Sequence, residues 1–278
     1  MTSKASQFSA DWLALREPVD HRSRAASLLA PLRHHLLGRG RTPALVVDLG
    51  AGSGSNQRYL AQRLGVPAHW TLLDQNIALL DRASLAAPAG TSLVVKVADL
   101  SLPLPPALGA ADLVTASALL DLASEEWIGA LCRTCARAQA AVLVALTIDG
   151  RVQFESPEPL DERMGQWIEQ DQHRDKGLGV ACGGRASDVL EQTLARLGYQ
   201  VMKQRSDWVL GAADAALARA WILGWQEAAL RQCPREAPGI EEWTSHRLGA
   251  AGKGGTIQIG HLDLLGLPPT GPSEGRSA

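Results

Sequence analysis

The sequence predicts an α/β fold whose seven-stranded, mostly parallel sheet is flanked by helices. Two observations lead to it: short apolar runs alternate with amphipathic segments from residue 44 onward, and three glycines follow the first run at every second position. Such alternation is typical of a parallel sheet. With 278 residues, 46% of them hydrophobic, the chain is long enough for one large domain with additions.

The strands are expected at the short apolar runs that alternate with the predicted helices. These runs are 44–49, 69–73, 92–97, 112–116, 141–148, 199–209 and 256–265. Helices are expected between them at 55–64, 76–86 and 186–197, with a further one starting near Ser124, which suits a helix N-terminus.

Three additions to this pattern are expected. Two helices, 10–15 and 22–37, precede the first strand and form an N-terminal helical cap over residues 1–40. Residues 149–185 are too long for a plain loop and are interpreted as a lid or substrate segment with a short helix at 160–170. Helices at 212–231 and 240–248 form a helical insertion, 212–252, before the last strand. The main domain is then 41–267, and 268–278 is expected to be a disordered tail.

The glycine turn follows an acid at the end of the first strand, in the order Asp48-Leu49-Gly50-Ala51-Gly52-Ser53-Gly54. A dinucleotide fingerprint would need its third glycine one residue later, and no Gly-Lys-Ser/Thr follows for a phosphate loop. The pattern Asp-x-Gly-x-Gly-x-Gly resembles motif I of the class I S-adenosylmethionine-dependent methyltransferases. The resemblance implies a Rossmann-like methyltransferase sheet, with S-adenosylmethionine as cofactor and S-adenosylhomocysteine as product.

Ligands of open α/β sheets lie beyond the carboxyl ends of the strands, so the strand ends are where the cofactor should bind. The resemblance implies that Asp74 binds the ribose hydroxyls, and that Asp99 and Leu100 meet the adenine. Asp48 and the amides near Gly50 and Gly52 are expected to face the methionyl ammonium and carboxylate. The full set of expected cofactor-binding residues is Asp48, Gly50, Ala51, Gly52, Gly54, Asp74, Gln75, Asp99, Leu100, Ser117, Ala118 and Arg22.

The acceptor site is expected under the segment from His173 to Gly179. His173 is the candidate catalytic base, because histidine titrates near neutral pH. Arg174 and Lys176 would pair with a negative group of the substrate, and Asp121 at the end of the fourth strand would bind it too. A solvated charged loop remains the alternative.

Other polar and aromatic residues have plainer interpretations. Arg16, Arg22 and Arg24 could meet a carboxylate, or could lie on a solvated helix face. Trp221, Trp225 and Trp243 are expected to pack rather than to stack on a substrate. His261 and Asp263 are expected to be polar residues at the edge of the sheet.

Composition limits the partners. A formal charge of −2 and a pI near 6.4 disfavour nucleic acid, and no apolar run reaches the length of a membrane span. Because Met1 to Lys4 starts no secretory signal, the expected compartment is the cytoplasm. Four cysteines include a single Cys-x-x-Cys, so no metal site is expected. A homodimer is an open alternative.

The leading hypothesis is an enzyme that transfers a methyl group from S-adenosylmethionine to an oxygen or nitrogen of a small polar metabolite by in-line displacement. The sequence lacks the Asn/Asp-Pro-Pro-aromatic motif of amino-adenine methylation, the Pro-Cys nucleophile of cytosine C5 methylation and the two-glutamate loop of protein arginine methyltransferases, and these absences weaken macromolecular acceptors. Two alternatives stay open. One is a catalytically silent cofactor-binding interaction module, and the other is a NAD-dependent dehydrogenase.

Overall fold

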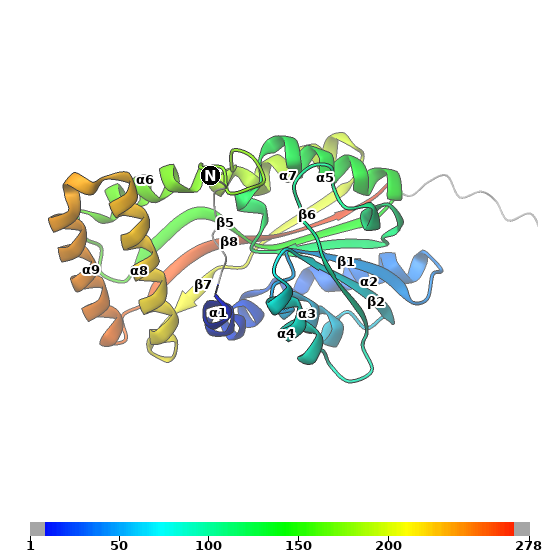
Figure 1. Cartoon of the computed structure of the whole chain (residues 1–278), viewed down its shortest axis with the longest axis horizontal. Coiled ribbons are helices and arrows are strands. Elements are labelled where there is room, and N and C mark those ends of the chain that lie inside the picture. Colours follow the sequence, from blue (N-terminus) through cyan, green and yellow to red (C-terminus); the bar gives the residue numbers. More distant parts are fainter. Residues whose placement is uncertain (1–8, 270–278) are drawn as a thin grey trace, which may run out of the picture.

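The computed structural model describes residues 9–269, and a single mixed sheet runs through its centre (Figure 1). The strand order is β3, β2, β1, β4, β5, β8 and β6, with β7 also paired to β8. Neighbours from β3 to β5 are parallel, whereas β8 lies antiparallel between β5 and β6. This arrangement confirms the predicted α/β fold. The strands are β1 Ala44–Leu49, β2 Ala68–Asp74, β3 Ser92–Val97, β4 Leu113–Ser117, β5 Ala141–Phe154, β6 Gln200–Arg205, β7 Trp208–Leu210 and β8 Ile257–Leu267.

Helices cover both faces of the sheet (Figure 1). One face is covered by α2 Leu29–Gly38, α3 Ser55–Arg63 and α4 Ile77–Leu85, which share a buried cluster with β1 and β2. The opposite face is covered by α5 Glu125–Ala138 and α7 Ala186–Arg196, which pack on β4 and β5. Because β1, β4 and the first half of β5 are buried from both sides, they are apolar without alternation.

A third group of helices lies at one end of the molecule, where β5 and β8 extend beyond the other strands (Figure 1). It contains α1 Ala10–Ser23, α6 Asp161–Gln172, α8 Ala215–Gln232 and α9 Ala237–Gly252, which share one buried cluster. Trp221 and Trp225 lie with ring centroids 4.4 Å apart, and Trp225 stacks on Trp243 at 6.2 Å. The three tryptophans therefore pack against one another, as predicted.

The predicted strand 199–209 is wrong as a single element, because it is two strands. The chain turns at Asp207, whose carboxylate accepts hydrogen bonds from the His261 amide at 3.1 Å and from the Gln258 side chain at 2.8 Å. Arg151 also donates to Asp207, at 2.8 Å. These bonds to side chains and amides outside the segment redirect it, so that β6 and β7 pair with different parts of β8.

The predicted break between residues 15 and 22 is also wrong, because α1 continues through Pro18. The Ser9 hydroxyl caps the helix by accepting a hydrogen bond from the Trp12 amide at 3.1 Å. Proline removes one helical hydrogen bond, but the next two residues, Val19 and Asp20, are buried against the rest of the molecule. Arg22 consequently lies in the last turn of α1 rather than at the start of a second helix.

His261 and Asp263 lie in the interior of the sheet and not at its edge. β8 has a neighbour on each side, and both side chains are almost fully buried. The Asp263 carboxylate accepts hydrogen bonds from the Arg24 side chain at 3.1 Å and from the amides of Ala25 and Leu146 at 3.0 and 2.8 Å. The prediction failed because the sequence does not show that a strand from the end of the chain inserts between two earlier ones.

Candidate functional site

The turn after β1 reverses the chain through three glycines in the left-handed region. Gly50, Gly52 and Gly54 have φ values of 61°, 51° and 83°, which other residues adopt at a cost. Neighbouring side chains add to this cost: a Cβ on Gly54 would clash with the Cβ of Ala83 at 2.9 Å, and one on Gly52 would make a tight contact of 3.2 Å with the Cδ1 of Leu13. The sequence therefore has glycine here both for conformation and for close packing.

Most amides of this turn already donate within the protein. The Ala51 amide donates to the Leu73 carbonyl at 3.0 Å, the Gly52 amide to Asp74 Oδ2 at 2.8 Å, and the Gly54 amide to the Ala51 carbonyl at 2.8 Å. A pyrophosphate would need free amides at this position. The expectation that the Gly52 amide faces the methionyl group is corrected, because Asp74 accepts its hydrogen.

Asp48 lies beneath the turn rather than in the cavity in front of it. Its side chain is fully buried, Oδ1 accepts a hydrogen bond from Asn56 Nδ2 at 2.7 Å, and Oδ2 has no partner among the described residues. Burial raises the pKa of this carboxyl to about 7, against the opposing effect of the Asn56 hydrogen bond. The expected contact between Asp48 and the ligand ammonium is therefore replaced by a buried role under the loop.

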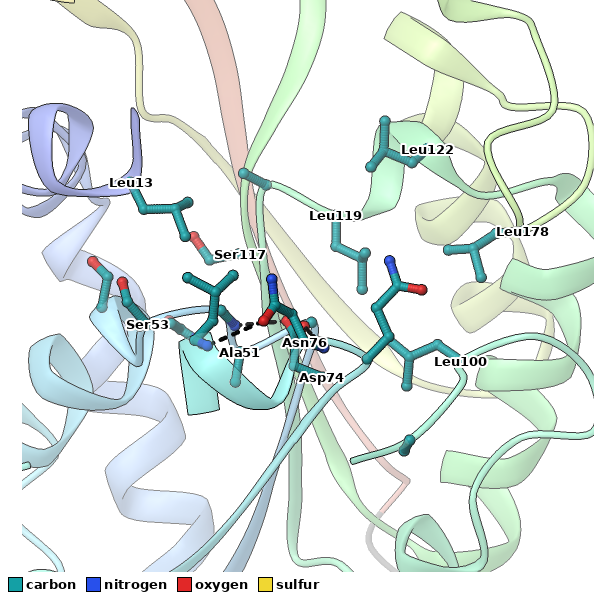
Figure 2. A pocket seen from close by; sticks show the side chains of 18 of the residues that line it. Leu13, Ala51, Ser53, Asp74, Asn76, Leu100, Ser117, Leu119, Leu122 and Leu178 are labelled. Carbon is teal, nitrogen blue, oxygen red and sulfur yellow. Dashed lines mark hydrogen bonds between the residues drawn. The ribbon is translucent and has the colours of Figure 1, made fainter. Parts of the chain in front are cut away.

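Asp74 closes the end of β2 and lines the cavity (Figure 2). Its Oδ1 accepts a hydrogen bond from the Asn76 amide at 2.9 Å, and its Oδ2 from the Gly52 amide. A carboxylate offers about four lone-pair sites, so two remain for a ligand. The two backbone bonds fix its orientation, and Gln75 lines the cavity beside it.

Asp99 and Leu100 follow β3 and also line the cavity. The Ser101 amide donates to Asp99 Oδ1 at 2.8 Å, which leaves Oδ2 without a partner in the part of the chain that the structure describes. The Leu100 carbonyl accepts the indole N–H of the buried Trp127 at 2.6 Å. The Ser101 amide and the Trp127 indole therefore fix the positions of Asp99 and Leu100, and Asp99 Oδ2 is available to a ligand.

The end of β4 forms the floor of the cavity. Ser117 and Ala118 line it, and Ala118 has a φ of 52°, which is uncommon outside glycine. Its amide donates to the Ala145 carbonyl of β5 at 2.9 Å, so the neighbouring strand holds this conformation.

Two separate segments cover the cavity from opposite sides (Figure 2). On one side α1 contributes Leu13, Arg16 and Asp20, and on the other the chain from Lys176 to Leu178 lies near Leu122. Glu17 ties α1 to α3 through a two-pronged ion pair with Arg58 at 2.6 and 2.8 Å. The cavity is thus a pocket at the carboxyl ends of β1 to β4, where ligands of such sheets bind.

Comparison with known proteins agrees with this geometry. Residues 46–140, which include the glycine turn, Asp74, Asp99 and the floor, match the family described as "Methyltransferase domain". This match shows a methyltransferase domain, as the resemblance to the class I S-adenosylmethionine-dependent methyltransferases implies. The cofactor of this methyltransferase is S-adenosylmethionine, and no curated protein sequence matches the chain.

Solved structures similar to this methyltransferase have low sequence identity to it. The YcgJ protein from Bacillus subtilis is 14% identical with a TM-score of 0.49, over 86% of this chain and 100% of that one. A SAM-dependent methyltransferase from Geobacter sulfurreducens, in complex with S-adenosylhomocysteine, is 15% identical with a TM-score of 0.45, over 94% and 99%. The cyclopropane synthase MmaA2 from Mycobacterium tuberculosis is 13% identical with a TM-score of 0.47, over 93% and 94%.

The residues of the pocket fit this cofactor better than a dinucleotide. The turn has few free amides for phosphate, and Arg58 beside it is engaged by Glu17 and by the Ser53 carbonyl. An adenosine joined to an amino acid without any phosphate needs instead a carboxylate for its ribose and a polar group for its base. Asp74 and Asp99 are placed at the two successive strand ends that could provide them.

Of the expected acceptor residues, only Lys176 lines the pocket. His173 caps the end of α6 and its Nδ1 lies 2.9 Å from the Ala181 carbonyl, while Arg174 pairs with Asp171 at 3.3 Å. Neither reaches the pocket, because the chain turns at the end of α6 and only then crosses its mouth. Asp121 lies beside the lining residues Leu119 and Leu122 of the turn after β4. Burial raises the pKa of its carboxyl, and the charges of Lys176 and Arg16 oppose that rise.

Arg22 does not line the pocket either. Its Nη2 lies 2.5 Å from Asp214 Oδ2 and 3.3 Å from the Val209 carbonyl, so it ties α1 to the start of α8. Arg16, one and a half turns earlier, lies in the pocket instead. The sequence predicts Arg22 rather than Arg16 as a cofactor-binding residue, since no pattern shows which face of α1 turns inward.

Three further findings concern the described part of the chain. Residues 9–269 contain no group of three or more His, Cys, Asp or Glu side chains that could hold a metal ion. Cys132 and Cys135 are buried free thiols in α5, and burial raises the pKa of both. Over the same residues, every helix is too short or too polar to cross a membrane.

Proposed function

We propose that this methyltransferase methylates an oxygen or nitrogen atom of a small polar metabolite. The observation that carries the proposal is the covered pocket: residues of α1 and residues 176–178 line it together with the strand ends at which the cofactor would bind. A macromolecule would need an open surface at that position. The proposed units are a cap of residues 1–40, a lid segment at 149–185 and a helical insertion at 212–252 in a main domain of 41–267. Residues 149–154 of the predicted lid form the end of β5, so the lid itself begins only after Phe154. The tail expected at 268–278 lies almost wholly outside the described residues.

Within this proposal the chain's own residues mainly bind, orient and exclude water. When bound, S-adenosylmethionine supplies a methyl group on a positively charged sulfur. Asp74 holds the ribose, Asp99 and Leu100 hold the adenine, and Ser117 and Ala118 support the reacting end from below. In-line displacement needs alignment in a dry site more than it needs a strong catalyst.

Lys176 and Asp121 are proposed to meet the polar groups of the acceptor. Lys176 has no ion-pair partner among residues 9–269, so its charge is available to an anionic group. Asp121 has a carboxyl whose pKa burial raises, which suits contact with an amine or hydroxyl that gives up a proton. His173 is not proposed as the base, because it does not line the pocket and its Nδ1 faces the Ala181 carbonyl at 2.9 Å.

The cofactor assignment is tested by ligand binding to the full chain. S-adenosylhomocysteine should raise the melting temperature and NAD should not, since a ligand that binds only the folded state stabilises it. Asp74→Ala should weaken S-adenosylhomocysteine by about 5- to 100-fold in calorimetry, from the loss of hydrogen bonds to a charged group. Asp81→Ala, at an exposed position of α4, is the matched control and should leave the affinity unchanged.

The acceptor is tested by turnover. A panel of small amines, alcohols and carboxylate-bearing metabolites is incubated with S-adenosylmethionine, and formation of S-adenosylhomocysteine is measured. Turnover on members of the panel supports the proposal. Tight cofactor binding with turnover on none of them would favour a cofactor-binding module without catalysis.

A further inference from the structure

Helix α1 brings one arginine into the pocket with part of its guanidinium unused. Arg16 lies one turn after Leu13 on the same face, and its side chain is 11% exposed. Its Nε and Nη2 donate to the two oxygens of Asp20, at 2.8 and 3.2 Å. Its Nη1 has no acceptor among the described residues. Since a guanidinium has donors on all three nitrogens, Arg16 can bind a second anion without releasing Asp20.

Trp208 holds this pair from behind. Its indole Nε1 donates to Asp20 Oδ1 at 3.0 Å, and the guanidinium carbon of Arg16 lies 5.0 Å from its ring centroid. Trp208 is 2% exposed and Asp20 is 6% exposed, so both side chains are held by the packing around them. A carboxylate and an aromatic face together fix the direction of the Arg16 side chain.

The strand order shows which end of the cofactor Arg16 would meet. Asp99 follows β3 and Asp74 follows β2, so base and ribose lie toward the β3 side of the sheet. Trp208 belongs to β7, which pairs with β8 on the far side of β5. Arg16 therefore approaches from the side opposite to the adenine, where the amino-acid end of the cofactor has to lie.

We propose that Arg16 binds the methionyl carboxylate of the cofactor through Nη1, and that Asp20 and Trp208 are its positioning residues. This proposal rests on the cofactor assignment and adds to it. It gives β7 a role, because this short strand supplies the ring against which Arg16 lies. β7 is thereby coupled to cofactor binding without touching the cofactor.

The test compares two ligands that differ only in the carboxylate. Dissociation constants are measured by calorimetry for S-adenosylhomocysteine and for its decarboxylated analogue, which keeps the ammonium, in the full chain. Arg16→Met should weaken S-adenosylhomocysteine by about tenfold or more and leave the analogue within about threefold, as expected for one charged hydrogen bond. Trp208→Phe keeps a ring but removes the N–H to Asp20. Trp208→Phe should reduce the preference for S-adenosylhomocysteine over the decarboxylated analogue by about threefold or more. This is the effect expected from the loss of one hydrogen bond between a neutral donor and a carboxylate.

Trp243→Phe is the matched control. Trp243 is also buried and also donates its indole N–H to an aspartate, Asp161, at 2.8 Å, but it lies in α9. It should leave the preference between the two ligands unchanged. Equal weakening of both ligands by Arg16→Met, or equal effects of the two tryptophan variants, would overturn the proposal while the cofactor assignment stands. If the unmodified protein does not bind S-adenosylhomocysteine, the cofactor assignment itself fails.

Discussion

Asp48 is a residue whose position the motif predicts and whose chemistry only the fold determines. The motif places an acid two residues before the first glycine, at the end of β1. In the structure the turn and α3 close over it, and burial raises the pKa of its carboxyl from 3.8 to about 7. A buried carboxylate with one unpartnered oxygen is costly in its charged form.

This raised pKa makes stability depend on pH. Below pH 3.8 Asp48 is protonated in both states; as the pH rises to about 7, the unfolded chain loses this proton first, so the free energy of unfolding falls. Asp48→Asn should remove that fall. Its stability relative to the unmodified protein should increase by about 1 to 4 kcal/mol between pH 4 and pH 7.5, as measured by urea unfolding at each pH. A constant difference between the two proteins across that range would contradict the burial of a titrating Asp48.

For the other residues of the site, the sequence predicts the position well where it depends on the strand ends and poorly where it depends on a distant partner. Asp74, Asp99 and the glycines lie where the strand ends predict them, because a parallel sheet brings successive strand ends to one edge. Arg22 and His173, in contrast, were predicted as site residues but do not line the pocket. Their partners are Asp214, 192 residues away, and the Ala181 carbonyl beyond a turn, and no spacing in the sequence shows either contact.

At the scale of elements, the strand, turn and helix around the glycines form a unit that tolerates no side chain at Gly54. Gly54 and Gly90 have nearly equal φ values, 83° and 80°, but a Cβ would meet Ala83 at Gly54 and nothing within 4 Å at Gly90. Both alanine variants should lose about 1 to 2 kcal/mol of unfolding free energy from the left-handed backbone. Gly54→Ala should lose about 1 to 3 kcal/mol more from overpacking, and should also weaken S-adenosylhomocysteine. Equal losses in chemical denaturation would mean that the turn does not pack on α4 as described.

The elements themselves were largely predictable, and the exceptions have specific causes. β1 and β3 were predicted over the residues that form them, and most other core strands and helices differ only at their ends. Long-range contacts caused the larger errors. Burial of Val19 and Asp20 carries α1 through Pro18, and the bonds of Asp207 to β8 divide one predicted strand into β6 and β7.

At the scale of the whole molecule, one buried ion pair joins the N-terminal segment to the last strand. Arg24 and Asp263 have side chains 3% and 2% exposed, and Arg24 also donates to Asn56 of α3 at 2.8 Å. Arg24→Leu should cost about 3 to 5 kcal/mol of unfolding free energy, because it leaves a buried carboxylate without its counter-ion. The matched control is Arg22→Leu, two residues earlier, whose partner is Asp214 and whose side chain is 47% exposed. It should cost less than about 1 kcal/mol. Similar losses for the two variants in guanidinium unfolding would contradict this difference in burial.

In the molecule as a whole, the cofactor pocket lies where the sheet, α1 and residues 176–178 meet. A crystal structure with S-adenosylhomocysteine bound is the most direct test of this pocket. We predict that the ribose hydroxyls bind Asp74, that the adenine lies beside Asp99 and Leu100, and that the amino-acid end lies between the glycine turn and α1. A ligand bound elsewhere, or bound in this pocket with its adenine at α1, would contradict this prediction.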